Sequence, residues 1–177
     1  ATIFARDIDN DNDIDIIESH QFRDDSTSFS INIYKNDGTS SPQFTKDSIH
    51  THTKPDFWGS DNNMIISSLY VEDLNNDGEL DIIYSTGTPS KVEPIQYTYD
   101  LKNYKGGLHW LENDGSESFT HHSIVDTLIN GGSINSIYVD DIDGNNFPDI
   151  ITTSKRIFSV EYDEWGSNIV DVQYRSS

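Results

Sequence analysis

At 177 residues the chain is long enough for one domain with a sizeable core. It carries 31 Asp and Glu against 11 Lys and Arg, a formal net charge of −20. This acidic excess argues against nucleic acid and anionic membranes as partners, because both recruit clustered cations. No apolar run approaches the roughly 18 residues of a spanning helix, so membrane insertion is not expected. The chain has no cysteine, which excludes disulfides, thiolate metal sites and cysteine nucleophiles.

The first unit of the chain reads as four short strands. An apolar strand at 2–4 is followed by an acidic loop at 5–17, ARDIDNDNDIDII, which ends in a second apolar strand. A hairpin follows further on, with Asn36-Asp37-Gly38 at its turn and Phe44 after it. Asn-Asp-Gly between alternating segments favours a hairpin, because Asn and Gly tolerate a positive φ.

The same pattern recurs twice further along the chain. Acidic loops at 71–83, VEDLNNDGELDII, and 139–151, VDDIDGNNFPDII, match the first loop. A second Asn-Asp-Gly hairpin lies at 108–119, and a degenerate copy is expected at 160–170. We therefore predict a single all-β segment over 1–177 with repeat units at approximately 1–66, 67–134 and 135–177. Four antiparallel strands per unit are typical of a β-propeller blade, so we expect three consecutive blades.

The acidic loops share one arrangement of oxygen ligands. If the first Asp of each loop is position 1, side-chain oxygens fall at positions 1, 3, 5 and 9, with a turn residue at 6 and an expected carbonyl ligand at 7. Ca²⁺ prefers six to eight oxygen ligands, so each loop predicts one calcium site. The alternative is a solvated acidic turn, as most short charge runs are. The predicted ligands are Asp7, Asp9, Asp11, Asp13 and Asp15 in loop one; Asp73, Asn75, Asp77, Glu79 and Asp81 in loop two; and Asp141, Asp143, Asn145, Phe147 and Asp149 in loop three.

The loop D-x-D-x-D-G-x-x-D followed by aliphatic residues, with the hairpin downstream, resembles the FG-GAP/VCBS repeats of integrin-α-like β-propellers. Loop two matches best; loop one has Asn12 in place of the glycine, and loop three has Asn145-Asn146. The resemblance implies that the calcium ions are structural and lie on the blade periphery. It also implies about seven blades in a full ring. Three blades cannot close a ring, so the segment is expected to join further blades of the same chain or another copy.

The connections opposite the acidic loops are the expected ligand face, because binding residues commonly sit on loops of a rigid scaffold. They are rich in aromatic and basic residues, although these side chains could simply pack their own loops. The candidates are Phe22, Trp58, Tyr97, Tyr99, Lys102 and Tyr104. The histidines give no metal site from spacing: His50 and His52 face one side without a third ligand, His109 is a strand residue, and His121 and His122 point to opposite faces.

Catalytic motifs are absent from the sequence, and the repeat assigns the acidic residues to metal. We expect a non-catalytic calcium-binding module for adhesion, for recognition of an extracellular protein or glycan surface, or for structural assembly. An extracellular location is expected, because loops of modest affinity fill only at extracellular Ca²⁺ concentrations. The alternative is the propeller portion of a carbohydrate-active enzyme such as a polysaccharide lyase, with the basic and aromatic cluster acting on an acidic polysaccharide.

Overall fold

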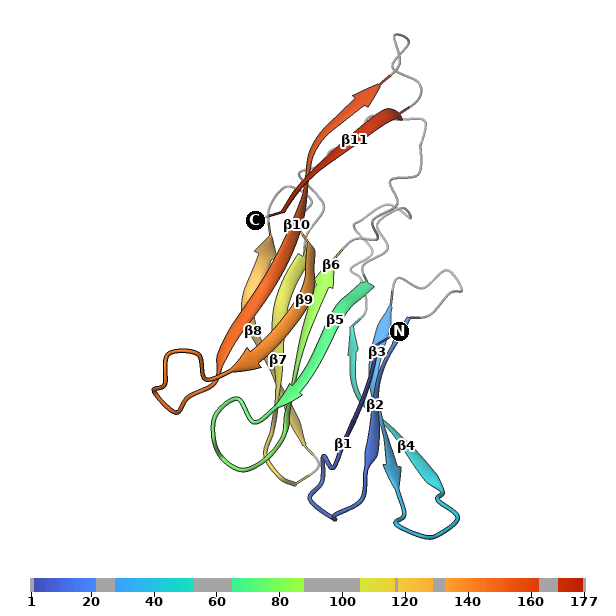
Figure 1. The fold of residues 1–177 in the computed structure, drawn as a ribbon. Helices are drawn as coiled ribbons and strands as arrows, with labels where there is room; N and C mark the ends of the chain where they lie inside the picture. Colours follow the sequence, from blue (N-terminus) through green and yellow to red (C-terminus); the bar gives the residue numbers. More distant parts are fainter. Residues whose placement is uncertain are drawn as a thin grey trace.

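The computed structural model describes residues 2–21, 28–52, 65–87, 106–116, 118–128, 133–162 and 169–176. In these ranges the chain forms eleven β-strands in three antiparallel sheets and no helix (Figure 1). The described part of the chain thus offers no helix long and apolar enough to cross a bilayer. The predicted all-β fold class is confirmed.

Two of the sheets have the predicted four strands, and in each sheet the strands pair in sequence order, antiparallel to one another. Sheet I contains β1 (Ile3–Arg6), β2 (Asp15–Gln21), β3 (Phe29–Asn36) and β4 (Phe44–His52). Sheet II contains β5 (Ile65–Glu72), β6 (Asp81–Gly87), β7 (Gly106–Asn113) and β8 (Phe119–Leu128). Every residue of β6 is buried, because this strand is central in the sheet that lies between the other two.

Sheet III departs from the predicted four strands. It contains β9 (Ser133–Asp140), β10 (Asp149–Tyr162) and β11 (Ile169–Ser176), in the order β11-β10-β9. The sequence predicted a separate strand beginning near Val160, but Val160 belongs to β10 and pairs with Val172 of β11. The segment 149–162 contains no Gly, Pro or Asn, so nothing in it breaks the strand. In the described residues the third unit therefore has three strands, with one long strand where two were expected.

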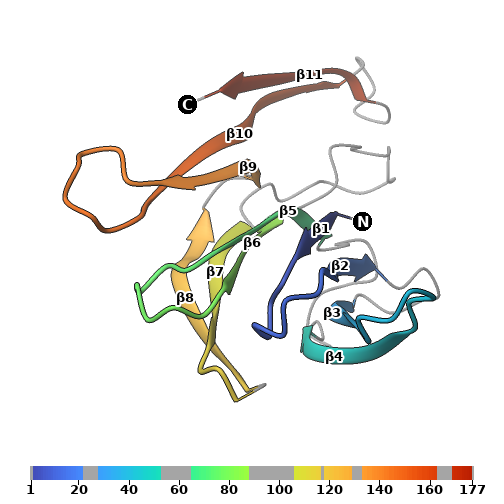
Figure 2. The same cartoon turned by 60° about the horizontal axis from the view of Figure 1, so that its bottom comes forward.

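The three sheets stack face to face and follow one another without closing into a ring (Figure 2). One apolar cluster joins sheets I and II; its most buried members include Ile17, Ile33 and Ile82. A second cluster joins sheets II and III through residues such as Ile83, Ile137 and Val139. Sheet II thus contributes alternate side chains, such as the neighbours Ile82 and Ile83, to two different interfaces, because successive side chains of a strand point to opposite faces.

The connections that follow β1, β3, β5, β7 and β9 all lie toward one end of the sheets, the lower end in Figure 1. An antiparallel meander has this geometry, because alternate connections return to the same end. We call the three acidic connections loop one (7–15), loop two (73–81) and loop three (141–149). The Asn-Asp-Gly turns after β3 and β7 lie at this same end, so each can reach the acidic loop of its own sheet.

Candidate metal centres

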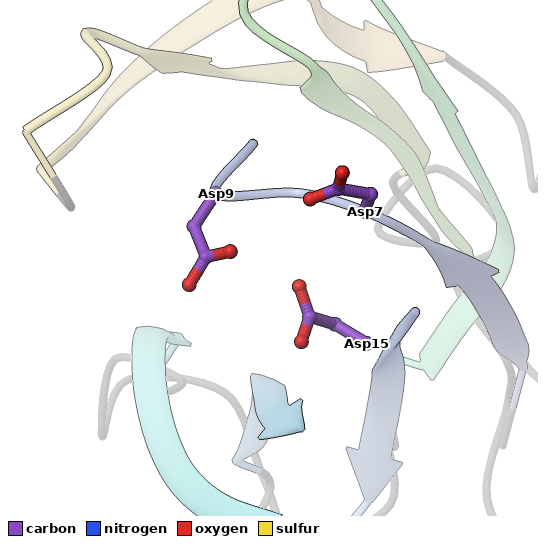
Figure 3. Close-up of side chains that lie close together, drawn as sticks. All are labelled: Asp7, Asp9 and Asp15. Atoms are coloured by element: carbon purple, nitrogen blue, oxygen red, sulfur yellow. The ribbon is translucent and has the colours of Figure 1, made fainter. Parts of the chain in front are cut away.

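Loop one brings three carboxylates to a common point. Asp7 follows β1, Asp9 lies in the loop, and Asp15 begins β2. One carboxylate oxygen from each lies within 4.8 Å of the other two, and the side chains converge on a shared space (Figure 3). Because Ca–O bonds are about 2.3–2.6 Å long, oxygens bound to one ion are at most about 5 Å apart. The three side chains therefore fit a single hard cation.

Loop three groups the same positions, with carboxylate oxygens of Asp141, Asp143 and Asp149 also within 4.8 Å of one another. Loop two carries Asn75 at position 3 in place of an aspartate. Asn75 Oδ1 accepts a hydrogen bond from the Asp77 N–H at 3.1 Å, and its Nδ2 donates to Asp77 Oδ2 at 2.8 Å. The amide therefore occupies the same position in the turn and offers a neutral oxygen there.

Backbone hydrogen bonds shape the three loops in the same way. The carboxylate at position 1 accepts hydrogen bonds from the N–H groups of positions 5 and 6, and the side-chain oxygen at position 5 accepts one from position 7. The position-1 bonds measure 3.1 and 3.0 Å in loop one, 3.1 and 2.9 Å in loop two, and 3.0 and 2.8 Å in loop three. Because these bonds hold the first carboxylate within the loop, the loops have one conformation despite their different residues.

Positive backbone φ angles occur at two positions of the loops, not one. At position 6 they are 74° for Asn12, 94° for Gly78 and 67° for Asn146. This agrees with the turn residue that the sequence predicted at position 6. At position 4 they are 60° for Asn10, 59° for Asn76 and 76° for Gly144. The sequence analysis missed position 4, although the restriction to Asn and Gly was the signal, since these residues best tolerate this conformation.

In loops one and two, the aspartate at position 9, which closes the loop, accepts a hydrogen bond from the third strand of its sheet. Asp15 is 0% exposed; its Oδ2 accepts the N–H of Ile8 at 3.1 Å, and its Oδ1 accepts the N–H of Asn36, the last residue of β3, at 2.9 Å. The amide of Asn36 also donates to the Ile14 carbonyl at 3.3 Å. The asparagine of the Asn-Asp-Gly turn thus holds the acidic loop, a role that the sequence analysis did not assign.

Sheet II repeats this arrangement with shorter bonds. Asp81 is also 0% exposed, and it accepts the N–H groups of Leu74 at 2.9 Å and Asn113 at 2.8 Å. The Asn113 amide donates to the Leu80 carbonyl of its own loop at 3.2 Å and to the Ile8 carbonyl of loop one at 3.3 Å. Asn113 therefore fixes both the closing residue of loop two and the position of loop one.

Further hydrogen bonds link neighbouring loops. The Asn10 amide donates to Glu79 Oε2 at 2.9 Å, and the Asn76 amide donates to the Asn146 carbonyl at 2.7 Å. Both asparagines occupy position 4 of their loops. The side chain of Glu79, at position 7, is thus directed to the neighbouring loop; only its carbonyl was expected to bind metal.

Burial and mutual repulsion disfavour the charged form of these acids. Burial raises the pKa of Asp9, and the nearby carboxylates of Asp15 and Asp11 raise it further. Asp9 Oδ1 is buried without a hydrogen-bond partner, while its Oδ2 lies 3.8 Å from Lys35 Nζ. Burial also raises the pKa of Asp81, against the hydrogen bonds from Asn113 and Leu74. A divalent cation would favour the ionised form of both groups.

A cavity of about 290 Å³ opens beside loop one, between sheets I and II. Its apolar walls come from Ile8, Ile33, Ile49 and Phe119, and its polar lining is mainly acidic: Asp9, Asp11, Asp47 and Glu79, with Lys35. Water and small cations therefore have space next to Asp9.

Three histidines that the sequence analysis treated separately come together between sheets I and II. His121 lies between His50 and His109, with ring centroids 5.2 and 5.3 Å away. Buried Tyr84 stacks on His109 at 4.9 Å, and its hydroxyl lies 3.0 Å from His50 Nε2. Burial raises the pKa of Tyr84 well above its usual value. These histidines do not gather into a metal-binding group in the described residues.

His122 points to the other face of its strand, where it lies 2.7 Å from Glu112 and stacks on Trp110 at 4.6 Å. The opposite orientations of His121 and His122 agree with the alternation predicted for neighbouring residues in a strand. The residues predicted for a ligand face all lie outside the described part of the chain: Phe22, Trp58, Tyr97, Tyr99, Lys102 and Tyr104.

Comparison with known proteins identifies no relative: no family model, no curated protein and no solved structure matches the chain. The resemblance to FG-GAP/VCBS repeats therefore stays a prediction from the loop and hairpin motifs.

Proposed function

We propose that this chain is a calcium-stabilised, non-catalytic module of a secreted or cell-surface protein, in which each acidic loop binds one Ca²⁺ ion. Positions 1, 3, 5 and 9 would supply side-chain oxygens, and position 7 a backbone carbonyl. Oxygen ligands in a flexible loop favour Ca²⁺ over Mg²⁺, which requires shorter bonds and near-ideal octahedral geometry.

The observation that carries this proposal is the carboxylate cluster of loop one, in which Asp15 is buried and Asp7 and Asp9 are partly buried. Asp15 is 0% exposed, and Asp9 has one buried oxygen without a hydrogen-bond partner. Bringing partly buried carboxylates together with little positive charge has an electrostatic cost, because both burial and mutual repulsion disfavour their ionised form. In the described residues, Lys35 supplies the only ion pair of a Lys or Arg with a carboxylate of the three loops. A divalent cation between Asp7, Asp9 and Asp15 would remove this cost.

We also propose that the sheets are propeller blades. Sheets I and II have the same strand order and register, and all three sheets stack in series through their flat faces. A propeller places such sheets around a central axis, typically with four to eight blades. The calcium ions would then fasten the first two strands of each blade at one end.

The biological role proposed for such a module is adhesion, recognition of a protein or glycan surface, or assembly of a larger protein. The metal loops and Asn-Asp-Gly turns lie at one end of the sheets (Figure 1), which leaves the connections at the other end for a ligand. The acidic residues in the loops are engaged in loop hydrogen bonds, and this supports a structural rather than a catalytic role.

The experiment that tests the calcium proposal is a calorimetric titration with Ca²⁺ combined with thermal unfolding in EDTA and in Ca²⁺. Three sites are expected. At a Ca²⁺ concentration about 100 times Kd, each independent site stabilises the folded state by about 2.7 kcal/mol. A chain of this size gains about 2–4 °C in Tm per kcal/mol, so each site filled should raise Tm by about 5–11 °C.

The double variant Asp141→Asn with Asp143→Asn should lower the stoichiometry from three to two, because these exposed residues supply loop three. The matched control is Asp37→Asn with Asp47→Asn, which changes the net charge equally outside the loops and should keep three sites. Calcium-independent stability together with no binding heat would disprove the proposal.

A further inference from the structure

Sheet I packs against sheet II through three apolar side chains on the face that it turns toward that sheet: Phe4, Ile8 and Ile17. Ile8 is 2% and Ile17 0% exposed, and both belong to the cluster shared by the two sheets, against which Phe4 packs. Phe4 also contacts Tyr70 of sheet II edge to face, with ring centroids 5.5 Å apart. These residues lie three positions before, one after and ten after the first aspartate of loop one.

Sheet II uses the same three positions to hold sheet III. They are occupied by Tyr70, Leu74 and Ile83. Ile83 is 0% exposed and belongs to the cluster shared with sheet III, and Tyr70 and Leu74 pack against that cluster. Tyr70 meets Tyr138 of sheet III edge to face at 6.0 Å. The interface between neighbouring sheets is therefore built the same way twice.

In sheet III the same three positions are apolar but exposed. Tyr138 is 50%, Ile142 55% and Ile151 46% exposed; we call these three residues the sheet III triad. Tyr138 and Ile151 are paired across β9 and β10, so they form one continuous patch. Sheet III thus has apolar residues at the three positions that contact a neighbouring sheet in sheets I and II, but in sheet III they are exposed.

The residues that receive such a triad are also repeated. In sheet II the triad of sheet I meets Leu69, Leu80 and Ile82, which belong to the shared cluster or pack against it. The corresponding positions of sheet I are Ile3, Ile14 and Ile16, on its outward face. Ile3 is 65% and Ile14 55% exposed. We call these three residues the sheet I receiving face.

We propose that two copies of this chain associate head to tail, with the sheet III triad of one copy docked on the sheet I receiving face of the other. Such a contact continues the two interfaces already present within the chain. Five of the eight large hydrophobic residues exposed in the described part of the chain lie in these two patches. Because the two patches differ, the association is heterologous and leaves one patch free at each end of a dimer.

The net charge of −20 opposes contact between copies, so association should strengthen as salt screens the repulsion. This inference goes beyond the proposed calcium-binding function and does not depend on it, since both patches are apolar. Sedimentation velocity over a range of protein concentrations, in EDTA and in Ca²⁺, measures association separately from ion binding.

The decisive experiment uses two single-patch variants, Ile151→Glu on sheet III and Ile3→Glu on sheet I. The wild-type chain should form concentration-dependent dimers and larger species. Each variant alone should be monomeric, since association requires both patches. An equimolar mixture should form dimers and nothing larger, because Ile3→Glu keeps an intact triad and Ile151→Glu an intact receiving face.

The matched control is Ile124→Glu, which makes the same change at a residue of β8 that is 41% exposed and belongs to neither patch. It should associate as the wild type does. All variants replace exposed residues, and far-ultraviolet circular dichroism verifies their folding. A wild-type chain that stays monomeric at every concentration in high salt overturns the proposal, as does a mixture that fails to form dimers.

Discussion

Loops one and three carry aspartates at the same three ligand positions, yet the residues that close them lie in different surroundings. Asp15 is 0% exposed and accepts two backbone N–H groups, from Ile8 within its loop and Asn36 on β3. Asp149 is only partly buried, and the hydrogen bond that it accepts in the described residues comes from Ile142 in its own loop. The same motif is thus enclosed in one sheet and open in another.

The cause of this difference is the position of the third strand. In sheet I, β3 pairs with β2 and ends with Asn36 beside the loop. In sheet III, β11 pairs with β10 only from Lys155 onward, so the start of β10, at Asp149, has β9 alone as its described neighbour. The comparison teaches that the motif in the sequence brings the aspartates together, whereas the neighbouring strand decides how deeply the last aspartate is buried and how many N–H groups it accepts.

The largest expected effect comes from replacing the aspartates at position 9, which close the loops. Asp81→Ala leaves the buried N–H group of Asn113 and the partly buried N–H group of Leu74 without acceptors, and a buried group left so costs about 1–3 kcal/mol. We expect Asp81→Ala to lower the free energy of unfolding in EDTA by about 2–4 kcal/mol. Asp149→Ala, with its single exposed partner, should lower it by less than about 1.5 kcal/mol. Urea denaturation measures both, and equal losses would refute the distinction between enclosed and open loops.

A second test removes the asparagines that seal the loops. Asn113 is 3% exposed and joins loop two to loop one, whereas Asn36 is more exposed and contacts loop one only. Asn113→Ala should cost about 1–2 kcal/mol and Asn36→Ala less than about 1 kcal/mol, because solvent replaces exposed hydrogen bonds readily. Chemical denaturation in EDTA gives both values. A larger loss for Asn36 would show that the link between sheets, which Asn113 makes and Asn36 does not, matters less than the hydrogen bonds from the third strand.

Much of this structure could be predicted from local sequence signals. Alternating apolar residues and the Asn-Asp-Gly turns gave all four strands of sheets I and II, because turn chemistry and side-chain alternation act over a few residues. The convergence of the carboxylates in loops one and three was also predictable, since Asp7, Asp9 and Asp15 lie within one short loop; their binding of a metal stays a prediction. Sheet III was mispredicted where 149–162 continues as one strand, because a weak turn signal near Val160 was given too much weight.

What the sequence could not supply is the packing between distant segments. Asn36 and Asp15 are brought together by strand pairing, and His50, His109 and His121 by the docking of sheet I on sheet II. Neither contact follows from spacing, because each depends on the relative position of two elements. The residues of the predicted ligand face, such as Trp58 and Tyr97, lie outside the described residues, so that prediction is untested.

A third, smaller effect on stability is expected from substitutions at position 4 of the loops, where the backbone φ is positive. Loops one and two have Asn there and loop three has Gly144, whose φ is 76° and whose added Cβ would meet nothing within 4 Å. Gly144→Ala therefore introduces backbone strain without a clash and should cost about 1 kcal/mol. Gly144→Asn should cost less, because Asn tolerates this conformation. Thermal unfolding ranks the two variants; an alanine as stable as glycine would argue against the loop conformation.

The smallest effect concerns the link between loops one and two. The Asn10 amide and Glu79 Oε2 are 2.9 Å apart but exposed, so water competes for both groups. A double-mutant cycle with Asn10→Ala and Glu79→Ala should give a coupling energy below about 1 kcal/mol in EDTA. Loop three has glycine at position 4 and so lacks a side chain for a comparable bond. A coupling above about 2 kcal/mol would mean that loops one and two fold as one unit, and their rigidity would then come from each other as much as from the third strand of each sheet.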